Sequence, residues 1–373
     1  MRVLILSWRC IKNPEMGGSE IYFHEIAKRW VKEGHKIIWF SPNFLGGKKE
    51  EICEGIKIVR RGNRATVYVH AFLNYIQNKL GKFDIIIDVE NGIPFFSPLY
   101  IKNGKVFLHI HHLHKDIWFK QMPLHTATLG YLLETIFMPR IYKNNEVITI
   151  SKSSANEINS KKVTRNRISI VNPGVKFYNY KKFQKNKTPS FLFLNRIKKY
   201  KGIDVFLNTA KILKNEKIEF WVAGSGNYLN DSKKFVIKNK LENVKFFGRI
   251  SEEKKKELMQ RTWAFINPSY KEGWGIVNIE SNYFGTIVLG SDVPGIKDSV
   301  INEKTGLLFK YGDSNELAKK ILWTIKNKKN RIKMEAFAVN FSKAFSWDIK
   351  SREYLKIITN QNLSHKLLQQ DFP

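Results

Sequence analysis

Two carboxylates, Glu272 and Glu280, stand eight residues apart around a turn that could bind hydroxyl groups of a ligand. Gly273 and Gly275 allow a tight backbone there, and apolar residues recur at helical spacing from Ile276 onward. Glu272 is therefore expected on a loop and Glu280 one turn inside a helix. A carboxylate accepts two directed hydrogen bonds from a diol, so both acids suit a hydroxyl-rich ligand. Such a pair found alone is more often a solvated loop acid and a helix-surface acid.

The first amides of that expected helix form a second candidate binding element. The N–H groups of Gly275, Ile276 and Val277 would lack acceptors within the helix and carry the positive end of its dipole, so they can hold a diphosphate. Arg196 and Lys201 follow an apolar run typical of a buried strand and precede a helical pattern. Two cations at a strand end can neutralise a diphosphate leaving group.

Four histidines crowd the end of an expected strand at 105–110: His109, His111, His112 and His114. A metal cluster is disfavoured because residues so closely spaced on a strand point alternately to opposite faces, and no nearby acid completes a site. His111 is the first residue past the strand, and its neutral imidazole could hydrogen-bond a ligand hydroxyl. The alternatives are His112 in that role, or an ordinary core or loop histidine.

Length and pattern predict the positioning scaffold. At 373 residues the chain exceeds the usual size of one core, and each half alternates strand and helix. We expect an α/β fold of two facing Rossmann-like domains with doubly wound parallel sheets and a cleft between them, at 1–175 and 186–346. Residues 176–187 read as a linker, and 347–373 as a helical stretch that returns to the first domain.

A glycine pair, Gly17-Gly18, enters the first helical pattern. It would let the backbone approach a phosphate, or it only forms a helix-entry turn. The spaced glycines of a dinucleotide fingerprint are missing, so a nicotinamide site is disfavoured. With Cys10 and Cys53 as the only cysteines, we expect reduced thiols. No apolar run reaches about 18 residues and the N-terminus lacks a signal pattern, so a cytoplasmic protein is expected.

The net charge of +31 implies an anionic partner. Lys57, Arg60, Arg61 and Arg64 precede an amphipathic segment at 67–76, a pattern that favours contact with an anionic membrane surface, here the inner face. The alternative is a plain solvated face.

Several motifs, in this order, resemble the retaining glycosyltransferases of family four, which have the GT-B fold: Gly17-Gly18-Ser19-Glu20, Arg196 with Lys201, Glu272 with Glu280, and the segment 285–295. The resemblance covers nearly the whole chain. One departure is Ile287-Val288-Leu289, where the family often has a Thr-Pro step.

The resemblance implies a nucleotide diphosphate sugar donor, such as a GDP- or UDP-sugar, and assigns its contacts. The expected donor contacts are Gly17 and Gly18 (diphosphate, from the first domain), Arg196, Lys201, Gly275, Ile276 and Val277 (diphosphate), Glu272 (sugar), Glu280 (ribose) and Ile250 (base). His111 would lie by the sugar, and with Glu272 it is the expected catalytic residue.

The resemblance also implies the reaction: a hexose moves to a sugar, glycan or lipid-linked acceptor by front-face attack, without a metal or cofactor. No Asp-x-Asp step is present to hold a metal at the donor. One alternative keeps the fold but makes the protein a nucleotide-sugar epimerase or a phosphorylase. A more distant one is a basic nucleic-acid-binding protein, for which no recognition signature is found.

Overall fold

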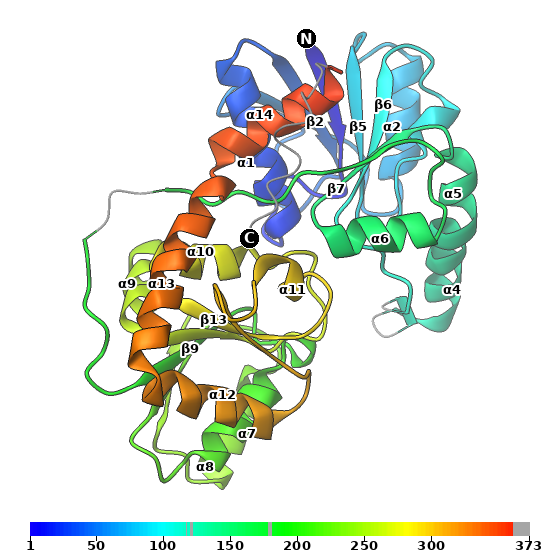
Figure 1. Cartoon of the computed structure of the whole chain (residues 1–373). Helices are drawn as coiled ribbons and strands as arrows, with labels where there is room; N and C mark the ends of the chain where they lie inside the picture. Colours follow the sequence, from blue (N-terminus) through cyan, green and yellow to red (C-terminus); the bar gives the residue numbers. More distant parts are fainter. Residues whose placement is uncertain (117, 120–121, 178–180, 361–373) are drawn as a thin grey trace. The chain divides into compact units, whose positions relative to one another are not determined.

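The computed structural model describes residues 1–116, 118–119, 122–177 and 181–360 and divides into two compact units (Figure 1). Unit 1 comprises Met1–Gly174 together with the chain from Trp347 onward, and unit 2 comprises Val175–Ser346. Each unit holds one sheet with helices on both faces, which confirms the predicted α/β class.

Unit 1 is built on an eight-stranded sheet in the described part of the chain. Its strands, in order across the sheet, are β3 (Glu50–Cys53), β4 (Ile56–Arg60), β2 (Lys36–Ser41), β1 (Arg2–Leu6), β5 (Ile85–Glu90), β6 (Lys105–Ile110), β7 (Glu146–Thr149) and β8 (Ile168–Ile170). All neighbours pair in parallel except β3, which runs antiparallel to β4. This edge hairpin is absent from the sequence-based expectation, because Glu50–Cys53 carries little apolar alternation.

The helices of unit 1 cover both faces of this sheet. They are α1 (Gly18–Lys32), α2 (Val67–Ile76), η1 (Ser97–Leu99), α4 (Leu124–Leu132), the π-helix η2 (Leu133–Phe137), α5 (Met138–Ile141), α6 (Lys152–Ser160) and α14 (Trp347–Ile358). Successive strand residues point to opposite faces. Leu4 and Leu6 thus share one core with Val67 of α2. On the other face, Phe23 of α1 packs edge-on against Trp39.

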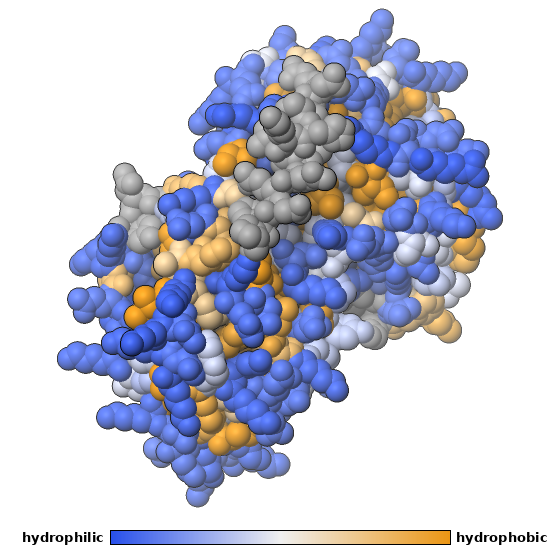
Figure 2. All heavy atoms as spheres, viewed as in Figure 1, coloured by the Kyte–Doolittle hydropathy of each residue, from blue (hydrophilic) through white to orange (hydrophobic). Residues whose placement is uncertain are grey.

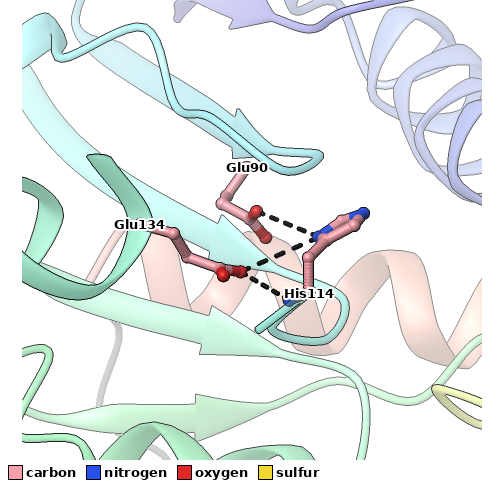
Figure 3. A group of neighbouring side chains, drawn as sticks. All are labelled: Glu90, His114 and Glu134. Carbon is pink, nitrogen blue, oxygen red and sulfur yellow. Dashed lines mark hydrogen bonds and ion pairs between the residues drawn. The ribbon is translucent and has the colours of Figure 1, made fainter. Parts of the chain in front are cut away.

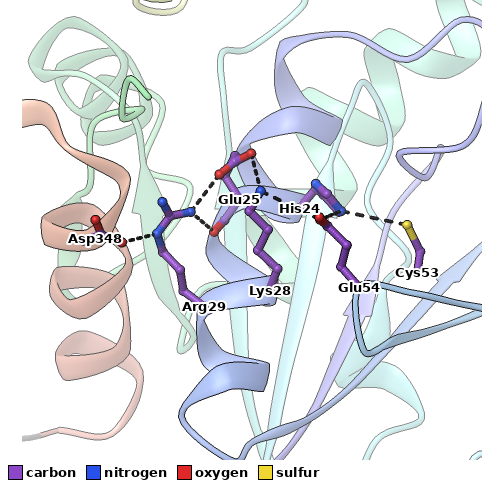
Figure 4. Close-up of polar contacts among 7 residues, drawn as sticks. All are labelled: His24, Glu25, Lys28, Arg29, Cys53, Glu54 and Asp348. Carbon is purple, nitrogen blue, oxygen red and sulfur yellow. Dashed lines mark hydrogen bonds and ion pairs between the residues drawn. The ribbon is translucent and has the colours of Figure 1, made fainter. Parts of the chain in front are cut away.

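The C-terminal helix α14 belongs to unit 1 and lies against α1 (Figure 4). Asp348 accepts a hydrogen bond of 2.6 Å from Nε of Arg29, and the same guanidinium bonds Glu25 within α1. The indole N–H of Trp30 donates to the carbonyl of Ser351 in a buried contact of 3.2 Å. A helical stretch is expected over 347–373 from the sequence. Helix α14 covers its first part and ends at Ile358, and residues 361–373 lie outside the described residues.

Unit 2 is built on a six-stranded parallel sheet in its described residues. In spatial order the strands are β11 (Val244–Gly248), β10 (Glu219–Ala223), β9 (Ser190–Leu194), β12 (Ala264–Asn267), β13 (Ile287–Ser291) and β14 (Gly306–Phe309). The helical elements are η3 (Lys199–Lys201), α7 (Ile203–Ile212), α8 (Leu229–Lys238), α9 (Glu252–Arg261), α10 (Ile276–Tyr283), α11 (Ile296–Ser299), α12 (Ser314–Lys326), α13 (Lys328–Ser342) and η4 (Lys343–Phe345).

Two hydrophobic cores sandwich this sheet. Phe191 and Phe193 of β9 pack with Phe206 of α7 on one face. Leu192, which points the opposite way, packs with Met259 of α9 on the other. A strand buried on both faces has the continuous apolar run seen at 190–194, so the sequence already predicts a central parallel strand there.

The segment 181–187 differs from its expected role as a free linker. Lys185 is half-buried, and its ammonium donates to the carbonyl of Thr262 at 2.8 Å. Burial lowers the pKa of Lys185 to about 8. The backbone N–H of Asn186 also bonds the carbonyl of Arg261. These contacts attach 181–187 to unit 2. Among the described residues, no helix combines the length and the apolar character needed to cross a bilayer.

Candidate active site

Lys201 and Glu272 form an ion pair in unit 2. Nζ of Lys201 lies 2.5 Å from Oε1 of Glu272, and the side chains are only 9% and 16% exposed. The hydroxyl of Ser269 also lies 3.1 Å from Oε1. The loops that carry the pair follow β9 and β12, which are neighbouring parallel strands, so both loops leave the sheet at the same edge. Ligands of open α/β sheets bind at that edge.

Two glycines allow the loop of Glu272 to sit where it does. A Cβ on Gly202 would lie 2.0 Å from the carbonyl oxygen of Pro268, and one on Gly295 would lie 2.0 Å from the carbonyl oxygen of Glu272. Both glycines also have positive φ, 75° and 85°. Backbone therefore packs directly on backbone on both sides of the loop, which restricts where the Glu272 carboxylate can point.

A buried chain of polar side chains supports the same loop. Nδ2 of Asn267, at the end of β12, donates to Oδ1 of Asn278 on α10 at 2.9 Å. Nδ2 of Asn278 donates to Ser299 at 2.8 Å, and the Ser299 hydroxyl reaches the carbonyl of Trp274 at 2.6 Å. Satisfied buried networks of this kind hold a single geometry. Sequence reasoning missed these residues, although polar positions inside an apolar helical pattern were a usable signal.

The N-terminus of α10 has unused donors. Gly275 is its N-cap, with φ of 80°. The amides of Gly275, Ile276 and Val277 have no hydrogen-bond acceptor among the described residues. With the helix dipole, such amides form an anion-binding site. A Cβ on Gly275 would lie 2.7 Å from Nδ2 of Asn278, so the tight turn predicted from the sequence requires glycine.

Glu280, inside α10 as predicted, is paired with a cation that the sequence did not indicate. Oε1 of Glu280 accepts a hydrogen bond of 2.7 Å from Nζ of Lys255 on α9. The two side chains are 23% and 19% exposed. Lys255 lies within three consecutive lysines, a run typical of a solvated face, and only the packing of α9 beside α10 distinguishes it.

Arg196 and Ile250 are less closely tied to this centre. Arg196 is exposed, and its backbone N–H donates to the side chain of Asn195 at 2.9 Å. No contact joins it to Lys201 or Glu272 among the described residues. Ile250 is half-buried on the same core cluster as Val277.

In unit 1, Gly17 and Gly18 form the entry to α1. The N–H of Gly17 donates to the carboxylate of Glu20 at 2.6 Å, which is the half of a capping box that a glycine N-cap can form. Glu20 is fully buried and also bonds Arg9 at 3.3 Å. The Gly17 amide is therefore already used, whereas the Gly18 amide has no acceptor among the described residues.

The structure separates His111 from His112. The His111 ring packs edge-on against Tyr22 and Phe23 of α1, and burial lowers its pKa to about 3, so the imidazole is neutral at physiological pH. Its Nε2 is buried and has no hydrogen-bond partner among the described residues. His112 instead stacks on His114, with ring centroids 5.0 Å apart.

The expected cationic cluster is largely neutralised. Each of its members has a glutamate partner: Lys57 and Arg61 bond Glu50, Arg60 bonds Glu51, and Arg64 bonds Glu15. Arg60 is fully buried, so its assignment to a membrane-facing surface is wrong. The reason is the unpredicted strand β3, which places Glu50 and Glu51 opposite Val59 and Ile58 of β4.

Comparison with known proteins adds independent information. The model of glycosyl transferases group 1 matches residues 176–340, and that of glycosyltransferase family 4 matches residues 16–177. An uncharacterized glycosyltransferase of Methanocaldococcus jannaschii is 27% identical over 361 residues, covering 93% of this chain and 95% of its own. The chain belongs to the family-four glycosyltransferases. Its recognition from sequence is confirmed, and as a group 1 glycosyltransferase it acts on sugar-nucleotide donors.

This family-four glycosyltransferase is also similar to a curated eukaryotic protein and to a solved bacterial structure. The gpi3 subunit of the phosphatidylinositol N-acetylglucosaminyltransferase of Schizosaccharomyces pombe is 22% identical over 384 residues, 94% of this chain and 80% of its own. The Anabaena protein HepE, solved with UDP and glucose, superposes with a TM-score of 0.70 at 14% identity, covering 96% of this chain and 100% of its own. The second likeness concerns the fold, and it agrees with the GT-B architecture expected from sequence.

Proposed function

We propose that this glycosyltransferase moves a hexose from a UDP- or GDP-sugar to a lipid-linked or glycan acceptor, with retention of the anomeric configuration. The observation that carries the proposal is the Lys201–Glu272 pair on the loops after β9 and β12. Beside it in the sequence, α10 begins with three amides that have no acceptor among the described residues. A pyrophosphate needs donors of this kind, and a sugar needs a positioned carboxylate.

The proposed roles follow from the chemistry of each group. The α10 amides, Lys201 and Arg196 bind the diphosphate and neutralise the charge that develops as the glycosidic bond breaks. Glu272 accepts hydrogen bonds from the donor sugar, and Glu280 from the ribose. Lys255 holds the Glu280 carboxylate in place.

The base, the diphosphate and the sugar of the donor each have one further proposed contact. Ile250 lies against the base, and the amide of Gly18, beside Gly17, donates to the diphosphate. The neutral imidazole of His111 bonds a sugar hydroxyl, for which its unpartnered Nε2 is suited.

The proposed reaction is a front-face displacement. The leaving phosphate accepts the proton of the acceptor hydroxyl, so the reaction needs no pair of carboxylates flanking the scissile bond. Glu272 and Glu280 do not form such a pair because Glu280 is assigned to the ribose. No metal is proposed at the diphosphate, where the amides and cations supply the positive charge.

Nucleotide specificity is testable by thermal shift. UDP is expected to raise Tm more than GDP or ADP, because the similar protein HepE was solved with UDP. At a hundred times Kd a ligand stabilises by about 2.7 kcal/mol, which shifts Tm by several degrees. The UDP shift should be the same with and without a chelator. A shift that depends on added Mg²⁺ or Mn²⁺ would contradict the metal-free diphosphate site.

Product analysis separates transfer from the other reactions of this fold. Free nucleoside diphosphate should accumulate from the donor only when an acceptor is present. An epimerase would convert the donor sugar without releasing nucleotide, and a phosphorylase would require inorganic phosphate. Either pattern would exclude the proposed transfer.

The lipid-linked acceptor is supported by an exposed apolar surface in unit 1. Large apolar side chains 37% to 74% exposed lie on and around α4 and η2: Phe119, Met122, Leu124, Leu129, Leu132, Ile136 and Phe137. Figure 2 shows hydrophobic atoms at the lower right edge, over the region of α4 in Figure 1. Glu134, within this stretch, is buried, whereas Arg140 just beyond it is exposed. An apolar face bordered by a cation suits an anionic membrane.

Liposome sedimentation tests this contact. Vesicles with anionic lipid should retain the protein at low salt and release much of it at high salt, because the ionic attraction is screened. The double variant Leu124→Gln, Leu129→Gln should bind at least about tenfold less. Ile237→Gln, at an exposed position of α8 in unit 2, is the matched control and should bind like the parent. Equal recovery with neutral and anionic vesicles would refute the preference for anionic lipid, and recovery with neither would refute the membrane contact.

A further inference from the structure

Three ligand-type side chains, none of them assigned to the donor, converge in unit 1. They are Glu90, His114 and Glu134, with one ligand atom from each lying within 4.8 Å of the others (Figure 3). Nδ1 of His114 is 3.6 Å from Oε1 of Glu90 and 3.8 Å from Oε1 of Glu134. A metal at these histidines is disfavoured from the sequence alone because no nearby acid completes a site. The fold supplies two acids.

Different elements supply the three side chains. Glu90 ends β5, His114 lies in the loop after β6, and Glu134 lies on the π-helix η2. The β5 and β6 strands are neighbours, so Glu90 and the His114 loop lie at one sheet edge. π-Helical turns occur frequently at functional sites.

The two carboxylates are almost completely buried. The Glu90 side chain is 0% exposed and that of Glu134 is 1% exposed, whereas His114 is 20% exposed. The nearest lysine in sequence, Lys115, forms an ion pair with Glu157 at 2.6 Å. Buried carboxylates without full charge compensation are costly, so the group calls for added positive charge.

The hydrogen bonds orient both carboxylates toward one point. Both oxygens of Glu134 accept backbone N–H groups, from His114 and Lys115, and the indole of Trp118 adds a bond of 3.2 Å. Oε1 of Glu90 accepts the N–H of Gly92. Oε2 of Glu90 is buried and has no partner among the described residues. In Figure 3 the Glu90 carboxylate faces the imidazole. Supporting bonds of this type orient metal ligands.

The dimensions suit an ion and exclude a sugar. A tetrahedral Zn²⁺ with bonds of about 2.0–2.1 Å has its ligand atoms about 3.3–3.4 Å apart. The two separations from His114, 3.6 and 3.8 Å, need to contract by only a few tenths of an ångström, and the two carboxylates offer ligand atoms within 4.8 Å of each other. A carbohydrate could not reach a carboxylate oxygen with almost no exposed surface.

We propose that Glu90, His114 and Glu134 bind a divalent transition-metal ion of the Zn²⁺ class. Two carboxylates balance its charge, and one imidazole favours it over Mg²⁺ or Ca²⁺, which prefer oxygen ligands only. The partly exposed side of His114 leaves a fourth position for water. The ion joins three segments distant in sequence and thereby stabilises the loops at this sheet edge.

The test uses the full chain after chelator treatment and dialysis. Titration calorimetry with Zn²⁺ should detect a single tight site, and Mg²⁺ should give no comparable heat. Glu90→Gln and Glu134→Gln should each weaken Zn²⁺ binding at least about 100-fold. His125→Ala, at an exposed histidine of α4, should bind like the parent. Co²⁺ should give a visible absorption band that His114→Ala removes.

The rival arrangement is a protonated His114 bridging two carboxylates without a metal. Under this arrangement the parent protein binds Zn²⁺ no more tightly than Glu90→Gln does, and that result would overturn the proposal. Glu90→Gln keeps the shape of the side chain, and near-ultraviolet circular dichroism checks that it folds. Should Glu134→Gln fail to fold, Glu90→Gln alone decides.

Discussion

Replacing Glu272 with alanine should reduce sugar transfer at least about 100-fold while the protein stays folded. The carboxylate is held by Lys201 and Ser269, and its loop is packed against Gly295 and supported by buried hydrogen bonds, so the backbone should keep its place without the side chain. The loss should appear mainly in kcat, because the carboxylate orients the sugar at the reacting carbon. Steady-state kinetics with the donor identified by thermal shift measure it.

Two comparisons make this prediction specific. Glu272→Gln keeps the shape and one acceptor oxygen, so it should retain more activity than Glu272→Ala. Glu216→Ala removes an exposed acid elsewhere in unit 2 and should transfer at the parental rate. Parental turnover by Glu272→Ala, with an unchanged melting curve, would remove Glu272 from the mechanism.

Replacing Lys201 with alanine should weaken nucleoside diphosphate binding by about 10- to 100-fold, since a hydrogen bond to a charged group contributes about 1.5–3 kcal/mol. Lys201 is the ion-pair partner of Glu272, so the variant also leaves the Glu272 carboxylate without its cation. Both effects reduce transfer. Calorimetric titration with UDP measures the loss of nucleotide binding separately, because UDP has no donor sugar to contact Glu272.

The neighbouring Lys199 provides the matched control for Lys201. It lies on the same 3-10 turn but is exposed, so Lys199→Ala should change UDP affinity little. The double variant of Lys201 and Glu272 should lose less transfer than the sum of the single losses, because paired residues are not independent. Equal UDP affinity of parent and Lys201→Ala would place the diphosphate elsewhere.

The basic composition suggests a cationic surface at 57–64, but in the structure the cations of this cluster are paired with glutamates. Lys57, Arg61 and Arg64, expected to face a membrane, have glutamate partners, and Arg60 is buried. A net charge counts side chains but not their pairing, so it cannot locate a cationic surface. The apolar residues exposed around α4 became visible only with the fold, because a helix of this composition would otherwise be taken for core.

Local features were predictable because local residues decide them. The apolar run at 190–194 forms strand β9, and α10 begins at Ile276, directly after the glycine turn, as predicted. Continuous apolar runs and helical spacing indicate which residues are buried, and a positive φ favours glycine because other side chains are strained there. The loop position of Glu272 and the helical position of Glu280 follow from the same local rules.

The alternation of strands and helices, the glycine turns and the order of the family motif can be read from the sequence, since each depends on neighbouring residues. Which side chains meet across the chain follows from the fold: Lys255 with Glu280, β3 with the cations of β4, and Glu90 with His114 and Glu134. The physical reason is that parallel sheets bring the ends of distant strands to one edge. The partners of a charge therefore depend on strand order, which no local pattern contains.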